Sequence, residues 1–169
     1  ESVWELSITP NVTNGVGAIE ELGAIGGEFD ADSALVVTDP GLVEAGIADD
    51  VTATLGSIEH TVFDGVEPDP DVGDFEAAIA EAEAVDPDLL VGVGGGSAMD
   101  AAKTTSVVAE HGGDVLDYVA EPTGEGLPVP GPGIPTFAVP TTAGTGADTS
   151  PVTVISVPET DLKVGISSR

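Results

Sequence analysis

The sequence predicts an α/β fold with a mainly parallel β-sheet flanked by helices. Short apolar runs rich in β-branched residues alternate along the chain with longer segments of helical periodicity. The spacing leaves room for a helix between successive strands, which is typical of βαβ units with right-handed crossovers. With 169 residues, of which 41% are hydrophobic, the chain is large enough to bury the core of one domain.

Four runs have the composition of buried or half-buried strands. They are residues 34–38 (ALVVT), 59–65 (EHTVFDG), 89–93 (LLVGV) and 135–139 (PTFAV). Two further runs fall outside this alternation. Residues 3–9 (VWELSIT) are expected to form an edge or exchanged strand, and residues 152–157 (VTVISV) a final strand.

Four segments are expected to be helical: residues 14–25, 40–55, 72–85 and 97–110. Asn14 is a candidate N-cap for the first, and Pro40 suits the first turn of the second. The fourth stops before Gly112, where a glycine favours a helix end. Residues 122–135, rich in proline and glycine, are expected to be a surface connection.

The charge of the chain excludes several partners. Asp and Glu number 31 against 3 Lys and Arg, a formal net charge of −28. Such a surface repels nucleic acid and anionic membranes. The acids are scattered along the chain, and molar salt would screen their repulsion, so the pattern is typical of a halophilic protein. A disordered acidic interaction module is the alternative, and the regular apolar runs argue against it.

Residue counts limit metal and targeting functions. There is no cysteine, and the two histidines cannot build a tetrahedral zinc site alone. We expect His60 at a strand end and His111 in the last turn of the fourth helix. No apolar run is long enough for a transmembrane span, and the acidic first residues differ from a secretory leader, so a cytoplasmic protein is expected.

The strongest functional signal is VGVGGGSAMDAAK, residues 91–103. A buried strand runs into three glycines and a helix, a geometry whose free backbone N–H groups bind a diphosphate readily. We therefore expect the backbone donors of the glycine turn and of the helix start at Ser97 to form an anion site. The alternative is a simple turn in which Ser97 and Asp100 form a capping box.

Two other segments carry polar groups at strand ends. AVPTTAGTGADTS (residues 138–150) can offer threonine hydroxyls to a phosphate or ribose, although a self-satisfied turn is the alternative. In VVTDPG, Asp39 stands at the carboxyl end of a strand, where open sheets bind ligands. A carboxylate there can accept both hydroxyls of an adenosine ribose and would repel a 2′-phosphate, which favours NAD over NADP. Its alternative role is an N-cap, and the two roles are compatible.

Read together, GGGSAMDAAK, PTTAGTGAD, VVTDPG and FDGVEPDP resemble the iron-containing alcohol dehydrogenase family over nearly the whole chain. The resemblance implies that residues 1–169 form a Rossmann-like dinucleotide-binding domain, similar to that of dehydroquinate synthase. It also implies a helical metal-binding domain that is absent from this chain. The expected activity is hydride transfer between a small alcohol or aldehyde and NAD, in a homodimer. A divalent metal, iron or zinc, would be needed in the full-length enzyme, and no metal ligand is expected here.

The resemblance assigns roles to individual residues. Asp39 would hold the adenosine ribose, and Gly95, Gly96 and Ser97 the diphosphate. Asp100 would lie near the nicotinamide end and help to organise cofactor and substrate. Thr141, Thr142 and Thr145 would line the nucleotide cleft. Thr149 would lie near the nicotinamide, and Lys163 would approach the cofactor ribose.

Two positions depart from the family pattern, and two other functions remain open. Asp69 replaces the usual Asn of a G-V-x-P-N-P turn, and Asp148 replaces the Glu of TTAGTGSE. One alternative function is a non-catalytic nucleotide-binding module. The other is an enzyme similar to glycerol dehydrogenase or dehydroquinate synthase, but Ser97 replaces the lysine usual in glycerol dehydrogenases, and basic residues for a phosphorylated substrate are lacking.

Overall fold

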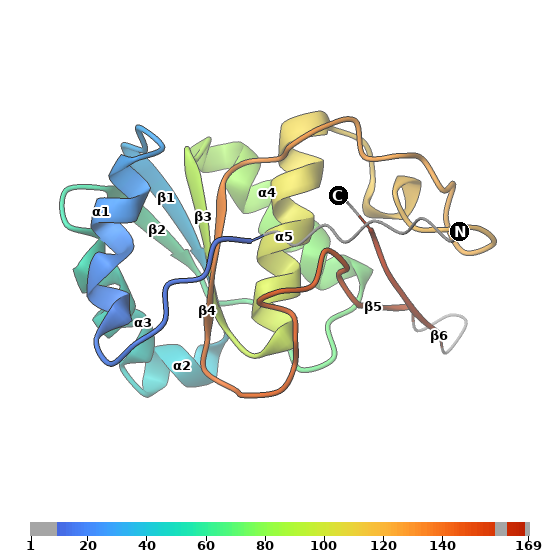
Figure 1. The fold of residues 1–169 in the computed structure, drawn as a ribbon. Helices are drawn as coiled ribbons and strands as arrows, with labels where there is room; N and C mark the ends of the chain where they lie inside the picture. Colours follow the sequence, from blue (N-terminus) through green and yellow to red (C-terminus); the bar gives the residue numbers. More distant parts are fainter. Residues whose placement is uncertain (1–9, 158–161, 168–169) are drawn as a thin grey trace, which may run out of the picture.

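The computed structural model describes residues 10–157 and 162–167. Its centre is a four-stranded parallel sheet in the order β2-β1-β3-β4 (Figure 1). The strands are β1 (Ser33–Val37), β2 (Glu59–Phe63), β3 (Leu89–Gly94) and β4 (Thr136–Pro140). Each matches one of the four predicted strands to within one or two residues at either end, and the α/β fold class is confirmed.

Helices cover both faces of the sheet (Figure 1). On one face lie α1 (Leu22–Gly27), α2 (Pro40–Glu44) and α3 (Ile47–Thr52), with single 3₁₀ turns at Ala18–Glu21 and Ala53–Leu55. On the other lie α4 (Val72–Val85) and α5 (Gly96–His111), followed by a 3₁₀ turn at Val115–Asp117. The molecule is therefore a three-layer α/β sandwich.

The central strands divide their side chains between two cores. In β1, Leu35 and Val37 pack with α4 and α5, whereas Ala34 and Val36 pack on the opposite face with α1 and α3. This follows from the two-residue period of a strand, and burial on both faces explains why β1 and β3 are continuously apolar. The edge strand β2 is mostly exposed, which accounts for polar residues such as His60.

The first helical segment differs from the expectation. Helical structure begins at Ala18 and not at Asn14, and no side chain caps it. The residue before it is Gly17, whose φ of 78° lies in the left-handed region. Since a glycine turn sets the entry of the chain, the predicted Asn14 cap is wrong.

The segment 40–55 is not one helix. It breaks at Gly46, which has a φ of 77° and separates α2 from α3. Left-handed glycine ends a helix readily, and the apolar periodicity continues across the break because both pieces pack on the same core. The predicted start at Pro40 is correct.

The predicted final strand is shorter than expected. It begins at Ile155, forming β5 (Ile155–Val157), which pairs in antiparallel fashion with β6 (Leu162–Val164) in a separate two-stranded sheet. Residues 152–154 are held instead by contacts with α5 and with residue 166. The expected strand at residues 3–9 lies outside the described residues.

The proline- and glycine-rich connection runs over the surface and is tied to α5 at its end. Ser106 Oγ donates to the Ile134 carbonyl at 2.7 Å, and His111 Nε2 lies 3.1 Å from the Gly131 carbonyl. His60 and His111 thus occupy the strand and helix end expected for them. Within the described ranges, no helix is both long and apolar enough to cross a bilayer.

Candidate functional site

The candidate site lies where the carboxyl ends of β1, β3 and β4 meet. Because these strands are parallel neighbours, the segments that leave them, beginning at Asp39, Gly95 and Thr141, emerge at the same edge of the sheet. This edge is where open α/β sheets bind ligands. The three motifs singled out in the sequence are therefore neighbours in space.

The turn after β3 depends on glycine. Gly94 has a φ of 151°, and a Cβ there would lie 2.8 Å from the Ala98 Cβ and 3.4 Å from Leu42 Cδ1. A side chain would therefore be both strained and crowded. The Gly94 carbonyl accepts the Thr141 N–H at 2.9 Å, which fixes the start of the threonine motif beside the glycine turn.

The first turn of α5 offers free backbone donors. The helix begins at Gly96 with Gly95 at the N-cap, and no side chain of the described residues accepts its first N–H groups. The expected alternative, a capping box between Ser97 and Asp100, is wrong, since the cap lies two residues before Ser97. The N–H groups of the first turn have no acceptor within the helix, so Gly96 and Ser97 present donors, with the positive end of the helix dipole behind them.

Asp39 combines two roles. Its Oδ1 accepts the Leu42 N–H at 3.1 Å, which caps α2. Its Oδ2 faces the glycine turn and would lie 3.6 Å from a Cβ on Gly94. One carboxylate oxygen therefore remains directed at the junction of β1 and β3.

The loop after β4, residues 141–149, faces the glycine turn; we call it the threonine loop. A Cβ on Gly95 would lie 3.8 Å from Thr142 Oγ1, and one on Gly96 would lie 3.6 Å from the Thr145 Cβ. Within the described residues the hydroxyls of Thr141 and Thr142 have no hydrogen-bond partner, whereas Thr149 Oγ1 reaches the Gly146 carbonyl at 3.4 Å. The loop is thus only partly self-satisfied and leaves hydroxyls for a ligand.

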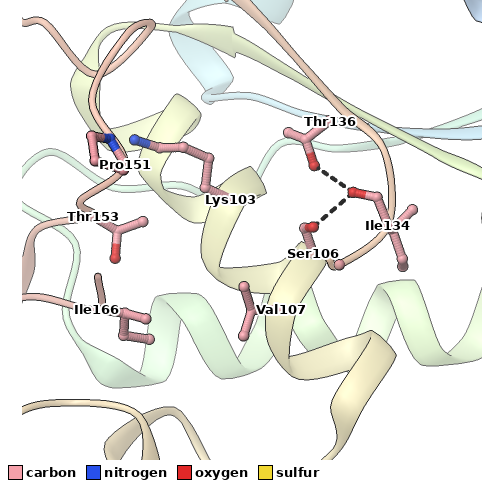
Figure 2. A pocket seen from close by; sticks show the side chains of 9 residues that line it. Lys103, Ser106, Val107, Ile134, Thr136, Pro151, Thr153 and Ile166 are labelled. Carbon is pink, nitrogen blue, oxygen red and sulfur yellow. Dashed lines mark hydrogen bonds between the residues drawn. The ribbon is translucent and has the colours of Figure 1, made fainter. Parts of the chain in front are cut away.

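Asp100 and Lys103 lie one turn further along α5, away from the glycine turn. Asp100 is 5% exposed; its Oδ1 pairs with Lys103 Nζ at 2.7 Å and its Oδ2 accepts the Val154 N–H at 3.0 Å. Lys103 also donates to three backbone carbonyls, one near the end of the threonine loop and two in the segment that follows it. Figure 2 shows its ammonium group beside Pro151 of that segment. Lys103 is not among the site residues predicted from the sequence, although its i, i+3 spacing from Asp100 could have indicated the pair.

Lys163 lies in β6 and forms an exposed ion pair with Asp69 at 2.6 Å. Asp69 has a φ of 56°, a conformation that Asp and Asn adopt more easily than most residues. The departure from the family's Asn thus occurs at a turn that tolerates either residue, and it supplies a partner for Lys163.

Two hollows border the threonine loop. One of about 550 Å³ runs along β4 between residues 10–15 and 147–150. The other, of about 430 Å³, lies beside Lys103, Thr136 and Thr153 (Figure 2). In the part of the chain that the structure describes, no three His, Asp or Glu side chains lie close enough together to hold a metal ion.

Comparison with known proteins shows the family of this chain. The family model described as iron-containing alcohol dehydrogenase matches residues 9–169. The chain is 39% identical to choline dehydrogenase of Bacillus subtilis over 158 residues, which cover 90% of this chain and 38% of that protein. It is 37% identical to long-chain-alcohol dehydrogenase 1 of Geobacillus thermodenitrificans over 161 residues, covering 94% and 40%.

A solved structure is similar over nearly the whole chain. Sulfoacetaldehyde reductase from Bifidobacterium kashiwanohense, determined in complex with NAD⁺, superposes with a TM-score of 0.90 at 27% identity. The match covers 99% of this chain and 44% of that one. The chain therefore spans less than half the length of these similar proteins.

Proposed function

Because the chain belongs to the iron-containing alcohol dehydrogenase family, we propose that residues 1–169 are the dinucleotide-binding part of an NAD-dependent alcohol dehydrogenase. The whole enzyme would transfer hydride between a small alcohol or aldehyde and NAD. The observation that carries this proposal is the uncapped first turn of α5, which faces the threonine loop and directly follows Gly94, beside which Asp39 lies. An NAD⁺ complex of a protein with the same fold supports it.

The residues at the sheet edge suit the parts of a dinucleotide. We assign the diphosphate to the backbone donors of Gly95, Gly96 and Ser97, because a helix N-terminus stabilises an anion without a formal positive charge. The chain has only 3 Lys and Arg residues and a net charge of −28, so a site made of backbone N–H groups can bind the diphosphate without using a basic side chain. Asp39 would bind the ribose hydroxyls through Oδ2 and keep Oδ1 on the Leu42 N–H.

The threonines and Lys163 would complete the cleft. Thr141, Thr142 and Thr145 would line it opposite the glycine turn, and Thr149 would lie towards the nicotinamide. Lys163 would approach a ribose by exchanging its surface pair with Asp69, which costs little because both groups are exposed.

Asp100 would act from behind the nicotinamide end. Both of its carboxylate oxygens are already paired, with Lys103 and with the Val154 N–H. It would therefore organise cofactor and substrate by holding the segment around residue 154, and not by direct contact with the ligand.

In this proposal the metal ion is bound outside residues 1–169. A divalent ion, iron or zinc, held by a helical domain beyond residue 169, would polarise the alcohol oxygen and stabilise the alkoxide. The residues described here would bind and orient the dinucleotide so that its nicotinamide meets the substrate. We further propose that the enzyme is a cytoplasmic homodimer from a salt-adapted organism. The acidic composition supports the salt adaptation, and the family resemblance supports the homodimer.

NADH titration tests the proposal. Fluorescence titration of the protein in about 2 M KCl, which screens its charge, should show saturable binding. Gly95→Asp places a carboxylate at the anion site and should weaken NADH binding by about tenfold or more, equivalent to at least about 1.4 kcal/mol. Gly27→Asp adds the same charge at an exposed glycine with nothing within 4 Å, and it should bind NADH as the wild type does.

Nucleotide specificity separates the proposal from its alternative. NADPH should bind more weakly than NADH, because Asp39 would face the 2′-phosphate. Absence of NADH binding by the wild type contradicts the proposal. Equal affinity for NADH, ADP and unrelated nucleotides would indicate a generic nucleotide-binding module.

A further inference from the structure

We propose that Lys103 is a positioning residue whose ammonium group clamps residues 147–154 to α5 and thereby holds the threonine loop over the dinucleotide site. The proposal rests on the function proposed above, since it concerns the geometry of the same site. It assigns a role to a side chain that lies outside the expected set of cofactor-binding residues.

The clamp consists of four oxygen atoms that surround the ammonium group of Lys103. Lys103 Nζ donates to the carbonyls of Ala147 at 2.9 Å, Val152 at 3.0 Å and Ser150 at 3.3 Å. It also lies 2.7 Å from Asp100 Oδ1. An ammonium group has three N–H donors, so the three carbonyls use its full donor capacity, and Asp100 Oδ1 adds an ionic contact. A neutral side chain at this position would leave three carbonyls and a carboxylate facing one another.

Asp100 extends the clamp by two residues. Its second oxygen accepts the Val154 N–H at 3.0 Å. The pair therefore holds both the end of the threonine loop and the segment leading into β5. The side chains of Lys103 and Asp100 are 20% and 8% exposed, so salt screens their attraction less than that of a surface pair.

The clamped segment is joined directly to the ligand-facing residues. The Ala147 carbonyl is held by Lys103, while the Ala147 Cβ lies 4.0 Å from where a Cβ on Gly96 would be. Thr145, two residues earlier, faces the same glycine at 3.6 Å. A shift of Ala147 would therefore change the width of the space between the first turn of α5 and the threonine loop.

Figure 2 shows the course of the Lys103 side chain. Lys103 leaves α5 and ends beside Pro151, on the segment that follows the threonine loop. Ser106 and Thr136 lie on the other side of the hollow, where both donate to the Ile134 carbonyl. The polar groups on that side serve the connection before β4, and only Lys103 reaches from α5 to the segment at residues 147–152 among the side chains drawn.

The test compares three variants of the protein in about 2 M KCl, where surface pairs are screened. Lys103→Met keeps the apolar stem and removes the ammonium group. Lys103→Arg keeps a cation with several donors. Val107→Ala removes two methyl groups one turn further along α5, from a buried core side chain that has no polar atom, so it tests the effect of loosened helix packing without removing a hydrogen bond.

NADH affinity and hydrogen exchange are the two measurements. Lys103→Met should weaken NADH binding by about tenfold, a loss of about 1.4 kcal/mol, and Lys103→Arg should recover part of it. Exchange of the Val154 amide and of the amides in 141–150 should speed up in Lys103→Met. Val107→Ala should leave both measurements within about twofold of the wild type while lowering the thermal midpoint.

The outcomes separate the clamp from the proposed function. A folded Lys103→Met protein with wild-type NADH affinity and unchanged exchange overturns the clamp and leaves the NAD assignment standing. Equal losses in Lys103→Met and Val107→Ala also overturn it, since general destabilisation would explain both. If the wild type binds no NADH, the proposed function fails, and faster exchange confined to residues 141–154 still supports the clamp. Lys103→Gln replaces Lys103→Met under the same criteria if the latter does not fold.

Discussion

Asp88 illustrates how single carboxylates stabilise this acidic chain. Its Oδ2 accepts the Ser33 hydroxyl at 2.8 Å and the N–H groups of Ser33 and Asp32 at 2.9 and 3.0 Å, which joins the starts of β1 and β3. The hydrogen bond from the Ser33 hydroxyl, followed by those from the two backbone N–H groups, lowers the pKa of Asp88 from its ordinary 3.8. The ionised form is therefore favoured by folding.

This lowered pKa predicts a pH-dependent difference between the wild type and Asp88→Asn. A depressed folded-state pKa stabilises the native state above the unfolded pKa, and the effect is lost as pH falls through the folded value. Urea unfolding should show the wild type more stable at pH 7, with the difference shrinking below about pH 4. Subtracting the free energy of unfolding of the variant from that of the wild type removes the contribution of the other carboxylates. A difference that is constant from pH 7 to about pH 2 contradicts the prediction.

β3 and α5 approach each other closely at Gly92, where there is no room for a side chain. A Cβ on Gly92 would lie 2.9 Å from the Ala102 Cβ and 3.0 Å from the Met99 Cα. Both atoms are buried, so the helix would have to shift. Gly92→Ala should lower the free energy of unfolding by about 1–3 kcal/mol, measured by urea denaturation.

Gly27 provides the matched control for that substitution. It ends α1, is exposed and has nothing within 4 Å of a built Cβ. Gly27→Ala should be neutral or stabilise the protein by up to about 1 kcal/mol, because alanine lowers the entropy of the unfolded chain. Equal effects of the two substitutions would show that the packing of α5 on β3 tolerates an added methyl group.

At the scale of elements, α4 shows how much an N-terminal capping box contributes to stability. Asp71 Oδ1 accepts the N–H groups of Gly73 and Asp74, and Asp74 Oδ2 accepts the Asp71 N–H at 2.9 Å. This capping box predicts that Asp71→Ala destabilises the protein by about 1 kcal/mol in thermal unfolding. Glu76→Ala, on the exposed face of the same helix, removes the same charge and should have little effect. A similar loss in both variants would assign the effect to charge and not to the cap.

The elements also show what the sequence can and cannot predict. Strand positions follow from short apolar runs, and the predicted bounds of α4, Val72–Val85, match the observed ones because a stripe of apolar residues runs along the helix. The break at Gly46 was missed because periodicity continues across it, and β6 was missed because its partner β5 holds only three residues. Such breaks depend on backbone conformation and pairing that residue type alone does not specify.

The same limit applies to the site. Parallel order alone brings the segments after β1, β3 and β4 together, so the neighbourhood of Asp39, Gly95 and Thr141 could be predicted. The contact of Asp100 with Val154 could not, since it joins residues 54 positions apart and Val154 lies on a segment without regular structure. Helical spacing indicates which side chains share a face, and only the tertiary fold determines what that face meets.

At the scale of the whole molecule, charge balance governs stability. The two lysines in the described ranges are both paired, Lys103 with Asp100 and Lys163 with Asp69. Apart from these two pairs, the acids in the described ranges are mostly exposed and have no cation partner there, in a chain of net charge −28. Their mutual repulsion falls as salt shortens the screening length from about 10 Å at 0.1 M to about 3 Å at 1 M.

This repulsion predicts that the thermal midpoint of unfolding rises as KCl increases from about 0.1 to 2 M. A triple variant, Glu20→Gln, Glu76→Gln and Glu83→Gln, removes three exposed carboxylates without altering the core. At low salt it should be more stable than the wild type by about 0.5–1 kcal/mol, and the difference should close in molar salt. Because salting-out of apolar surface acts equally on both proteins, the closing difference isolates the electrostatic part. If wild type and variant keep a constant separation across the salt range, the acidic surface does not set the salt response of this fold.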